Sequence, residues 1–233
     1  RGENAEITTY LENTADDVIL GVLPISFDYG LYQVLMAVKT GATLVLEKSF
    51  AFPHAVLQKM LAEGVTGFPI VPTMAALLLQ MKDLEPGALP HLRYITNTAA
   101  ALPPAFIARL RKLFPGAALY SMYGLTECKR CTWLPPDELD ARPASVGIAI
   151  PGTQAYVVDE QGRRIGAGEI GELVIRGPHV MKGYWENPEA TARALRPGPY
   201  PWESVLHTGD LFRADEDGFL YFVSRMDDII KTR

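Results

Sequence analysis

The strongest constraint on the fold is a regular alternation of short apolar runs and helix-like segments between Asp17 and Tyr123. Because the runs are apolar almost throughout, rather than at every second residue, they suit strands that are covered on both faces. The expected strands are 18–25, 42–46, 65–71, 92–96 and 117–121, and the expected helices are 29–39, 53–63, 73–82 and 103–114. This alternation predicts an α/β fold, a mostly parallel sheet with helices on both faces.

The segment 103–114 gives the clearest helical pattern. Two prolines at its start fit the first turn of a helix, where no backbone N–H is needed. Its apolar residues fall on one helical face: Phe106, Ile107, Leu110, Leu113 and Phe114. One face of this helix is therefore expected to pack on the sheet.

The pattern changes after about Ser145 to short β-like runs with turn residues between them. The runs are 154–158, 171–176, 206–207 and 219–223, and DEQG at 159–162 and DEDG at 215–218 are typical of hairpin turns. A β-rich antiparallel sheet or partial barrel is expected here. The polar, proline-rich stretch 134–143 (LPPDELDARP) is interpreted as the linker. The predicted domains are an α/β subdomain at 1–143, incomplete at its N-terminus, a β-rich subdomain at 144–226 and a hinge segment at 227–233.

The composition narrows the class of protein. With 233 residues, 48% of them hydrophobic, the chain has enough apolar material for a folded core. A net charge of −5 without any long basic run argues against nucleic acid as a partner. No apolar stretch approaches the roughly 20 residues that span a bilayer, and the first residues do not resemble a signal peptide. Two cysteines are too few for a disulfide framework, so a cytoplasmic location is predicted.

The two cysteines, Cys128 and Cys131, have Cys-x-x-Cys spacing. A structural zinc site normally needs four Cys or His ligands, and the four histidines offer no spaced partner pair. Redox use would need a thiolate at a helix N-terminus. Two ordinary cysteines are the favoured interpretation, and a metal or redox role is kept as an alternative.

A formal G-x-G-x-x-G occurs at Gly166, Gly168 and Gly171. In a dinucleotide-binding motif this pattern must follow a strand and open a helix. Here a turn precedes it and the expected strand follows. The stretch is therefore predicted to be a hairpin turn.

The chemistry of 123–127 (YGLTE) suits a nucleotide. Tyr123 offers an aromatic face, Gly124 allows a close backbone approach, Thr126 offers a hydroxyl for a phosphate oxygen, and Glu127 offers a carboxylate for Mg²⁺. On local chemistry alone, a polar turn at the end of a strand is an equally good interpretation. The carboxylate of Asp210, which follows another expected strand, could accept hydrogen bonds from both hydroxyls of a ribose.

Five stretches together resemble the adenylate-forming superfamily, which comprises acyl-CoA synthetases, nonribosomal peptide adenylation domains and luciferases. They are LPISFDYG at 23–30, TNTAAALP at 96–103, YGLTE at 123–127, GEIGELVIRG at 168–177 with MKGYWENPEAT after it, and HTGD at 207–210 with SRMDDIIK at 224–231. The resemblance extends over nearly the whole chain.

The resemblance implies roles for particular residues. Tyr123 is expected to pack on adenine, Thr126 to contact phosphate, and Asp210 with Arg225 to hold the ribose. Glu127 is expected to bind Mg²⁺ as the metal ligand, and with Thr126 it forms the expected catalytic pair. Gly124 belongs to the same nucleotide site. The family's adenine loop also belongs to it, and this chain has alanines where the family usually has glycines: Ala99, Ala100 and Ala101.

The resemblance also implies a substrate pocket and a hinge. Phe27, Asp28, Tyr29 and Met122 are expected to line the acid pocket, with core packing as the equal alternative. Apolar lining favours a fatty or aromatic acid, and Asp28 is the one candidate partner for an amine. Asp227 is expected to be the hinge before a mobile C-terminal domain.

The expected function is ATP-dependent activation of a carboxylic acid to an acyl-adenylate, followed by transfer to CoA, with ATP/AMP, Mg²⁺ and CoA as cofactors. The family's phosphate loop and its C-terminal lysine are expected outside 1–233, so this chain is expected to be a portion that does not complete the reaction alone. The alternatives are an adenylation domain that loads a carrier-protein thiol and a non-catalytic nucleotide-binding module.

Overall fold

The computed structural model describes residues 3–98 and 101–227. Ala99 and Ala100 of the expected adenine loop, and 228–231 at the end of SRMDDIIK, lie outside these residues. The described residues form two compact units. Those within 1–122 and 135–144 form the first unit, and those within 123–134 and 145–233 form the second.

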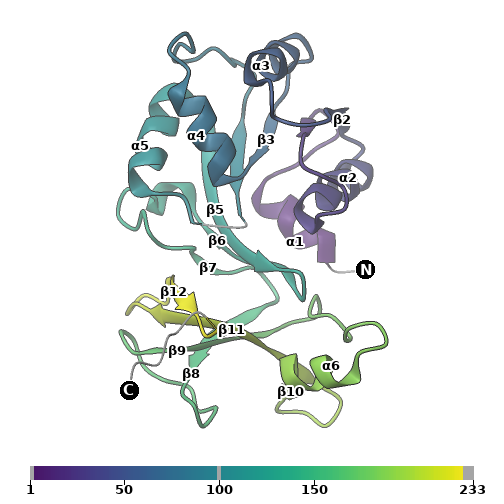
Figure 1. The fold of residues 1–233 in the computed structure, drawn as a ribbon, viewed down its shortest axis with the longest axis vertical. Helices are drawn as coiled ribbons and strands as arrows, with labels where there is room; N and C mark the ends of the chain where they lie inside the picture. Colours follow the sequence, from purple (N-terminus) through teal and green to yellow (C-terminus); the bar gives the residue numbers. More distant parts are fainter. Residues whose placement is uncertain (1–2, 99–100, 228–233) are drawn as a thin grey trace. The chain divides into compact units, whose positions relative to one another are not determined.

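The first unit alternates helices and strands (Figure 1). In chain order they are α1 (Glu3–Tyr10), β1 (Val18–Gly21), α2 (Asp28–Thr40), β2 (Thr43–Leu46), α3 (Pro53–Ala62), β3 (Gly67–Ile70), α4 (Pro72–Gln80), β4 (Tyr94–Asn97), α5 (Pro104–Leu113) and β5 (Ala118–Leu125). The last three residues of β5, 123–125, belong to the second unit. The strands pair in the order β2-β1-β3-β4-β5, and each of these pairs is parallel. This confirms the predicted fold class for the first part of the chain.

The central strands are covered on both faces. Every residue of β3 and β4 is buried, as the continuous apolar runs predicted. Figure 1 shows α4 and α5 together on one side of this sheet and α1 and α2 on the other. The helices α3, α4 and α5 each begin with a proline in the first turn, where its fixed φ and missing N–H do no harm.

The second unit is built from antiparallel strands. Its elements are β6 (Lys129–Leu134), β7 (Ile148–Ala149), β8 (Gln154–Val158), β9 (Ile170–Arg176), α6 (Pro188–Ala194), β10 (Leu195–Pro197), β11 (Ser204–Ala214) and β12 (Leu220–Arg225). The main sheet has the order β10-β11-β9-β8, with β12 also paired to β11. The predicted β-rich second half is confirmed.

The turns of this unit occur where the sequence predicted them. The Gly218 amide donates to the Asp215 carbonyl at 3.0 Å in the tight turn between β11 and β12. In the turn after β8, the Gly162 amide donates to the Asp159 carbonyl at 2.9 Å. The GAGEIG stretch forms a turn that leads into β9 and not into a helix. A dinucleotide-binding loop at this position is therefore excluded.

Several details differ from the sequence predictions. The helix α1 was not predicted, and its average hydrophobicity and weak periodicity give no amphipathic signal. Strand β5 continues to Leu125, so Tyr123 and Gly124 belong to the strand and do not follow it. The stretch 134–143 is also more than a linker, since it contains a 3₁₀ turn, Pro136–Glu138, and Leu139 is buried.

Gly124 is required by a close approach of two strands. A Cβ at this position would lie 1.8 Å from the Lys129 carbonyl oxygen of β6, so no side chain fits there. β5 and β6 are neighbouring strands joined by the short turn Thr126–Cys128. The glycine of the YGLTE stretch thus has a structural role that does not depend on a ligand.

We expect Gly124→Ala to destabilise the protein by about 2 kcal/mol, or about 6 °C in apparent Tm, because the added methyl group forces the strands apart. The matched control is Gly116→Ala, because a Cβ at Gly116 meets no atom within 4 Å. Thermal unfolding of both variants is the measurement. Equal melting temperatures for the two variants would contradict the structural role of Gly124.

Candidate functional site

The site is organised by an irregularity in β11. In the pairing of β11 with β9, His207 stands opposite Val174 and Leu211 opposite Glu172. Three residues of β11, 208–210, therefore stand opposite the single residue Leu173 of β9. Such a bulge bends the strand and re-aims its side chains. The HTGD stretch of the sequence is this bulge.

The backbone of the bulge is held by its own side chains and by one glycine. Gly209 has φ +71°, a conformation that other residues adopt only with strain. The Thr208 hydroxyl donates to the Leu173 carbonyl at 2.8 Å and accepts from the Asp210 amide at 3.1 Å. On the other edge of β11, the Met226 amide donates to the Gly209 carbonyl at 2.8 Å. The position of Asp210 is fixed from both sides.

Asp210 is the centre of the predicted nucleotide contacts. Its side chain is largely buried, and its Oδ2 accepts a hydrogen bond of 2.6 Å from the Tyr123 hydroxyl. Arg225, its neighbour on β12, places Nε 3.7 Å from Oδ1. The Arg225 side chain is 58% exposed, so a ligand can reach its guanidinium. The structure brings these three predicted residues together.

Burial is the main influence on the ionisation of this group. It raises the pKa of Asp210 above the ordinary value, and the Tyr123 hydrogen bond and the Arg225 charge oppose the increase. Burial likewise raises the pKa of Tyr123, helped by Cys131 and by the hydrogen bond to Asp210. Tyr123 therefore stays protonated and remains a hydrogen-bond donor. Its ring packs edge-on against Phe212, with centroids 4.9 Å apart.

Glu127 has a partner that the sequence did not indicate. The Tyr184 hydroxyl, from the loop before α6, donates a hydrogen bond to Glu127 Oε1. Burial, together with this bond, raises the pKa of Tyr184 to about 12. The backbone of Glu127 is also fixed, since its carbonyl accepts from the Met181 amide at 2.7 Å. The tip of the β5–β6 turn is thus tied to the MKGYWENPEAT stretch.

A second acid–base pair supports the bulge. His207 Nδ1 lies 2.7 Å from Glu172 Oε2, and the Gly209 amide donates to Glu172 Oε1 at 3.0 Å. Both side chains are mostly buried, 9% exposed for His207 and 13% for Glu172. Glu172 therefore uses each carboxylate oxygen for a different contact within the HTGD stretch.

Several of these groups border a common cavity in the second unit, whereas Asp210 and Tyr123 are not among its lining residues. The cavity has a volume of about 320 Å³. Its lining includes Glu127, Tyr184, His207, Gly209, Arg225 and Asp227. Asp227, the predicted hinge residue, is 80% exposed and lies 3.8 Å from the Arg225 guanidinium. The cavity combines cationic and carboxylate groups with a hydroxyl, a mixture that suits a polar, anionic ligand.

The remaining predicted site residues are placed as follows. Thr126 is exposed in the β5–β6 turn. Ala101 is exposed in the loop between β4 and α5 of the first unit. Met122 is buried, and its sulfur accepts a hydrogen bond of 3.2 Å from the Tyr10 hydroxyl. Its contact with Tyr10 agrees with the core-packing alternative for this residue.

The LPISFDYG stretch borders a cavity in the first unit of about 310 Å³. Leu23, Pro24, Ile25 and Gly30 line it, whereas Phe27 and Asp28 are not among its lining residues. Phe27 is 40% exposed. Asp28 lies in the first turn of α2, and its Oδ1 accepts from the Tyr29 amide at 2.8 Å. Their predicted role in substrate binding stays a prediction.

Both cysteines belong to the core of the second unit, where their thiols are free and buried. A hydrogen bond with the Cys131 thiol, opposed by burial and reinforced by His179, lowers the pKa of Cys128 to about 7. Burial raises the pKa of Cys131. Among the residues that the structure describes, no group of three or more His, Cys, Asp or Glu side chains could hold a metal ion.

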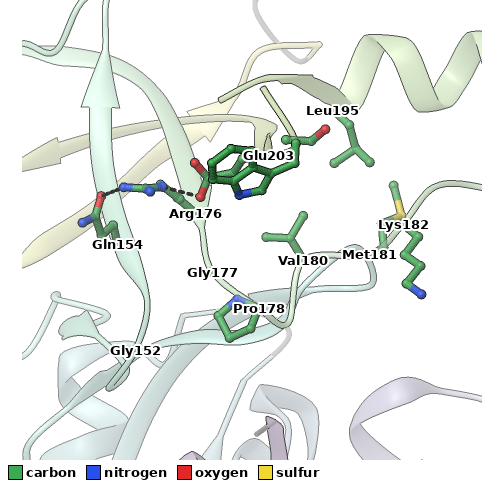
Figure 2. Close-up of a pocket in the computed structure, with 12 residues that line it drawn as sticks. Gly152, Gln154, Arg176, Gly177, Pro178, Val180, Met181, Lys182, Leu195 and Glu203 are labelled. Atoms are coloured by element: carbon green, nitrogen blue, oxygen red, sulfur yellow. Dashed lines mark hydrogen bonds and ion pairs between the residues drawn. The ribbon is translucent and has the colours of Figure 1, made fainter. Parts of the chain in front are cut away.

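Another cavity in the second unit, of about 770 Å³, shares no lining residue with the cavity of about 320 Å³. Figure 2 shows the Arg176 guanidinium between Gln154 and Glu203 in its wall, at 3.2 and 2.6 Å. Lys182 and Trp202 also line it, and none of the predicted site residues does. Arg176 is already paired with the Glu203 carboxylate, so its charge is largely compensated.

Comparisons with known proteins identify the family of the chain. A model of the family described as AMP-binding enzyme matches residues 3–185. This chain belongs to that family. A long-chain-fatty-acid–CoA ligase of Bacillus subtilis is 35% identical over 214 residues, which cover 91% of this chain and 37% of the ligase. The chain thus spans well under half the length of the curated relatives that it matches.

Solved structures of other AMP-binding enzymes have the same fold. VinN in complex with L-aspartate is 42% identical with a TM-score of 0.82, covering 95% of this chain and 53% of VinN. An O-succinylbenzoate coenzyme A synthetase from Bacillus subtilis in complex with AMP is 27% identical with a TM-score of 0.87, covering 97% of this chain and 45% of the synthetase. No helix in the described part of the chain is both long and apolar enough to cross a membrane.

Sequence reasoning missed the partners within this candidate site. Tyr184 and Glu127 are 57 positions apart, and Glu172 and His207 are 35 apart. Glu172 and Tyr184 do lie within the stretches that carry the family resemblance, and this was the available signal. The pairing of Glu172 with His207 depends on how β9 and β11 align, and the pairing of Tyr184 with Glu127 on how a loop folds onto a turn; the local sequence specifies neither.

We expect the burial of Asp210 to make stability depend on pH. Its pKa is raised in the folded protein, so the folded state binds the proton more tightly and loses stability as pH rises through this pKa. Asp210→Asn should therefore gain in Tm relative to the wild type as pH rises above the ordinary pKa of an aspartate, about 4. Asp16→Asn, at an exposed aspartate, is the control. A Tm difference between Asp210→Asn and wild type that is constant with pH would contradict this account.

Proposed function

We propose that the chain carries the adenylate-binding site of an enzyme that activates a carboxylic acid with ATP and passes the acyl group to a thiol. The observation that carries this proposal is the cluster of Asp210, Tyr123 and Arg225 on a bulged strand of the second unit. A carboxylate fixed in this way is an acceptor for the two hydroxyls of a ribose. The family membership and the AMP-bound synthetase support the nucleotide as ligand.

In the proposed reaction a carboxylate oxygen of the acid attacks the α-phosphorus of ATP, and pyrophosphate leaves. A thiol then attacks the acyl carbon, and AMP leaves. The protein's contribution is positioning and charge stabilisation. Asp210 and Arg225 hold the ribose, Tyr123 and Gly124 border the base, and Thr126 contacts phosphate.

Glu127 suits the proposed Mg²⁺ ion. Its carboxylate borders the 320 Å³ cavity, and Mg²⁺ usually takes one or two carboxylates together with substrate phosphates. Bound there, the ion would neutralise charge on the phosphates. Tyr184 holds one oxygen of this carboxylate and so restricts its orientation.

CoA is the proposed acceptor, because the ligase and the synthetase in the comparisons are both named for it. The same two names, a fatty-acid ligase and a succinylbenzoate synthetase, support a fatty or aromatic acid as the substrate.

A second candidate substrate is an amino acid. It is favoured by the 42% identity to VinN, which was solved with L-aspartate. Asp28, half-buried in the first turn of α2, is the carboxylate that could pair with the amine of such a substrate.

Asp210→Ala should raise the Kd for AMP at least about tenfold, since it removes charge-assisted hydrogen bonds to the ribose. Isothermal titration of this chain with AMP and with a non-hydrolysable acyl-adenylate analogue is the measurement. Asp217→Ala, in the exposed β11–β12 turn, is the control. Equal AMP affinity in wild type and Asp210→Ala would contradict the nucleotide site.

The acid is identified by ATP–pyrophosphate exchange in the full-length protein. Fatty and aromatic acids should support exchange in wild type, and Asp28→Ala should leave that exchange unchanged if the substrate carries no amine. If L-aspartate or a related amino acid is the substrate, Asp28→Ala should raise its KM by about tenfold or more through loss of an ion pair. AMP binding without exchange for any acid would favour a non-catalytic nucleotide-binding module.

A further inference from the structure

We propose that Glu172 and His207 are positioning residues of the nucleotide site, acting through the bulge that presents Asp210 to the ribose. This inference rests on the proposed nucleotide function of Asp210. Neither residue contacts Asp210 directly in the interactions observed; both act on the backbone that carries it.

The bulge removes hydrogen bonds from the ladder between β11 and β9. Between His207 and Leu211, β11 has three residues where β9 has one, so the regular ladder of hydrogen bonds between these strands is interrupted. A backbone N–H released from a ladder and partly buried must find another acceptor. The Gly209 amide finds it in Glu172 Oε1 at 3.0 Å.

The second step is the orientation of the Glu172 carboxylate. Its other oxygen, Oε2, lies 2.7 Å from His207 Nδ1, at the residue that immediately precedes the bulge. The two bonds diverge from one carboxylate and hold residues on both sides of Thr208. They therefore restrain the path of the chain into the bulge and its left-handed turn at Gly209.

The third step is electrostatic. Burial disfavours an ionised Glu172, but the hydrogen bonds from His207 and from the Gly209 amide outweigh burial, and the pKa of Glu172 is below its ordinary value. The carboxylate is thus charged at neutral pH. Charge-assisted hydrogen bonds are stronger than neutral ones, which suits a restraint on an irregular backbone.

The final step connects the restraint to the ligand. Asp210 directly follows Gly209, and its amide bonds to Thr208 within the same bulge. Release of the Gly209 amide would let the bulge relax toward regular pairing. Because a bulge sets the direction of its side chains, Asp210 would then lose its alignment with Tyr123 and Arg225.

The test compares AMP with 2′,3′-dideoxy-AMP, which lacks the two hydroxyls that Asp210 would accept from. Wild type should bind AMP at least about tenfold more tightly than the dideoxy nucleotide. Glu172→Ala should lose this preference while its affinity for dideoxy-AMP stays unchanged. Glu172→Gln keeps an oxygen acceptor for Gly209 and an amide donor for a neutral His207, so it should retain most of the preference.

Two further variants control for folding. His207→Ala leaves the hydrogen bond from the Gly209 amide to Glu172 intact. It should reduce the ratio of the Kd for dideoxy-AMP to the Kd for AMP to about the square root of the wild-type ratio. This variant keeps the test valid if Glu172→Ala does not fold. Glu169→Ala is the matched control. Its carboxylate also accepts from a backbone amide, that of Gly166 at 3.0 Å, but in an exposed turn outside the site.

The outcomes separate the two proposals. The positioning role is wrong if Glu172→Ala and His207→Ala weaken the binding of both nucleotides equally, or if they weaken the binding of neither. If wild type shows no preference for AMP and Asp210→Ala changes nothing, the proposed nucleotide function of Asp210 is wrong. If Asp210→Ala removes the preference and both Glu172→Ala and His207→Ala retain it, the nucleotide site stands and the positioning role does not.

Discussion

The geometry of the candidate site depends on the bulge in β11. A regular strand would alternate its side chains between the two faces of the sheet and would continue the ladder to β9 without interruption. The two additional residues allow Asp210 to meet the Tyr123 hydroxyl and to stand beside Arg225. Everything that stabilises this bulge, from the Gly209 conformation to the Thr208 and Glu172 hydrogen bonds, therefore also aligns the carboxylate.

Charge in this region is arranged in pairs that are buried to different degrees. The Glu172–His207 pair is mostly buried and serves the backbone, whereas Arg225 and Asp227 are exposed and open to a ligand. The Asp210 side chain is as buried as that of Glu172, but it has a hydroxyl donor and an exposed cation beside it. A buried pair gives rigidity and an exposed cation gives attraction for an anionic ligand, so the two roles are carried by different residues.

The fold was largely predictable because its strands carry a local signal. Continuous apolar runs indicated the parallel strands, and β3 and β4 are buried along their whole length. The site was predictable only in part, through motifs that the family resemblance supplied. The Tyr123–Asp210 bond joins residues 87 positions apart on strands of different sheets, and tertiary packing, which the local sequence does not specify, decides such a pairing. The same reason explains why Tyr184 was not expected as the partner of Glu127.

Gly124 in YGLTE and Gly209 in HTGD are both required by the backbone of the protein, whether or not a ligand binds. Gly124 in YGLTE suggested a close approach of a ligand, yet the atom that excludes a side chain there is the Lys129 carbonyl oxygen of the neighbouring strand. Gly209 in HTGD is required by its positive φ within the bulge. Both residues would therefore be needed even in a member of the family that had lost turnover. The presence of these motifs establishes the scaffold of the site, and its chemistry has to be argued from Asp210, Arg225 and Glu127.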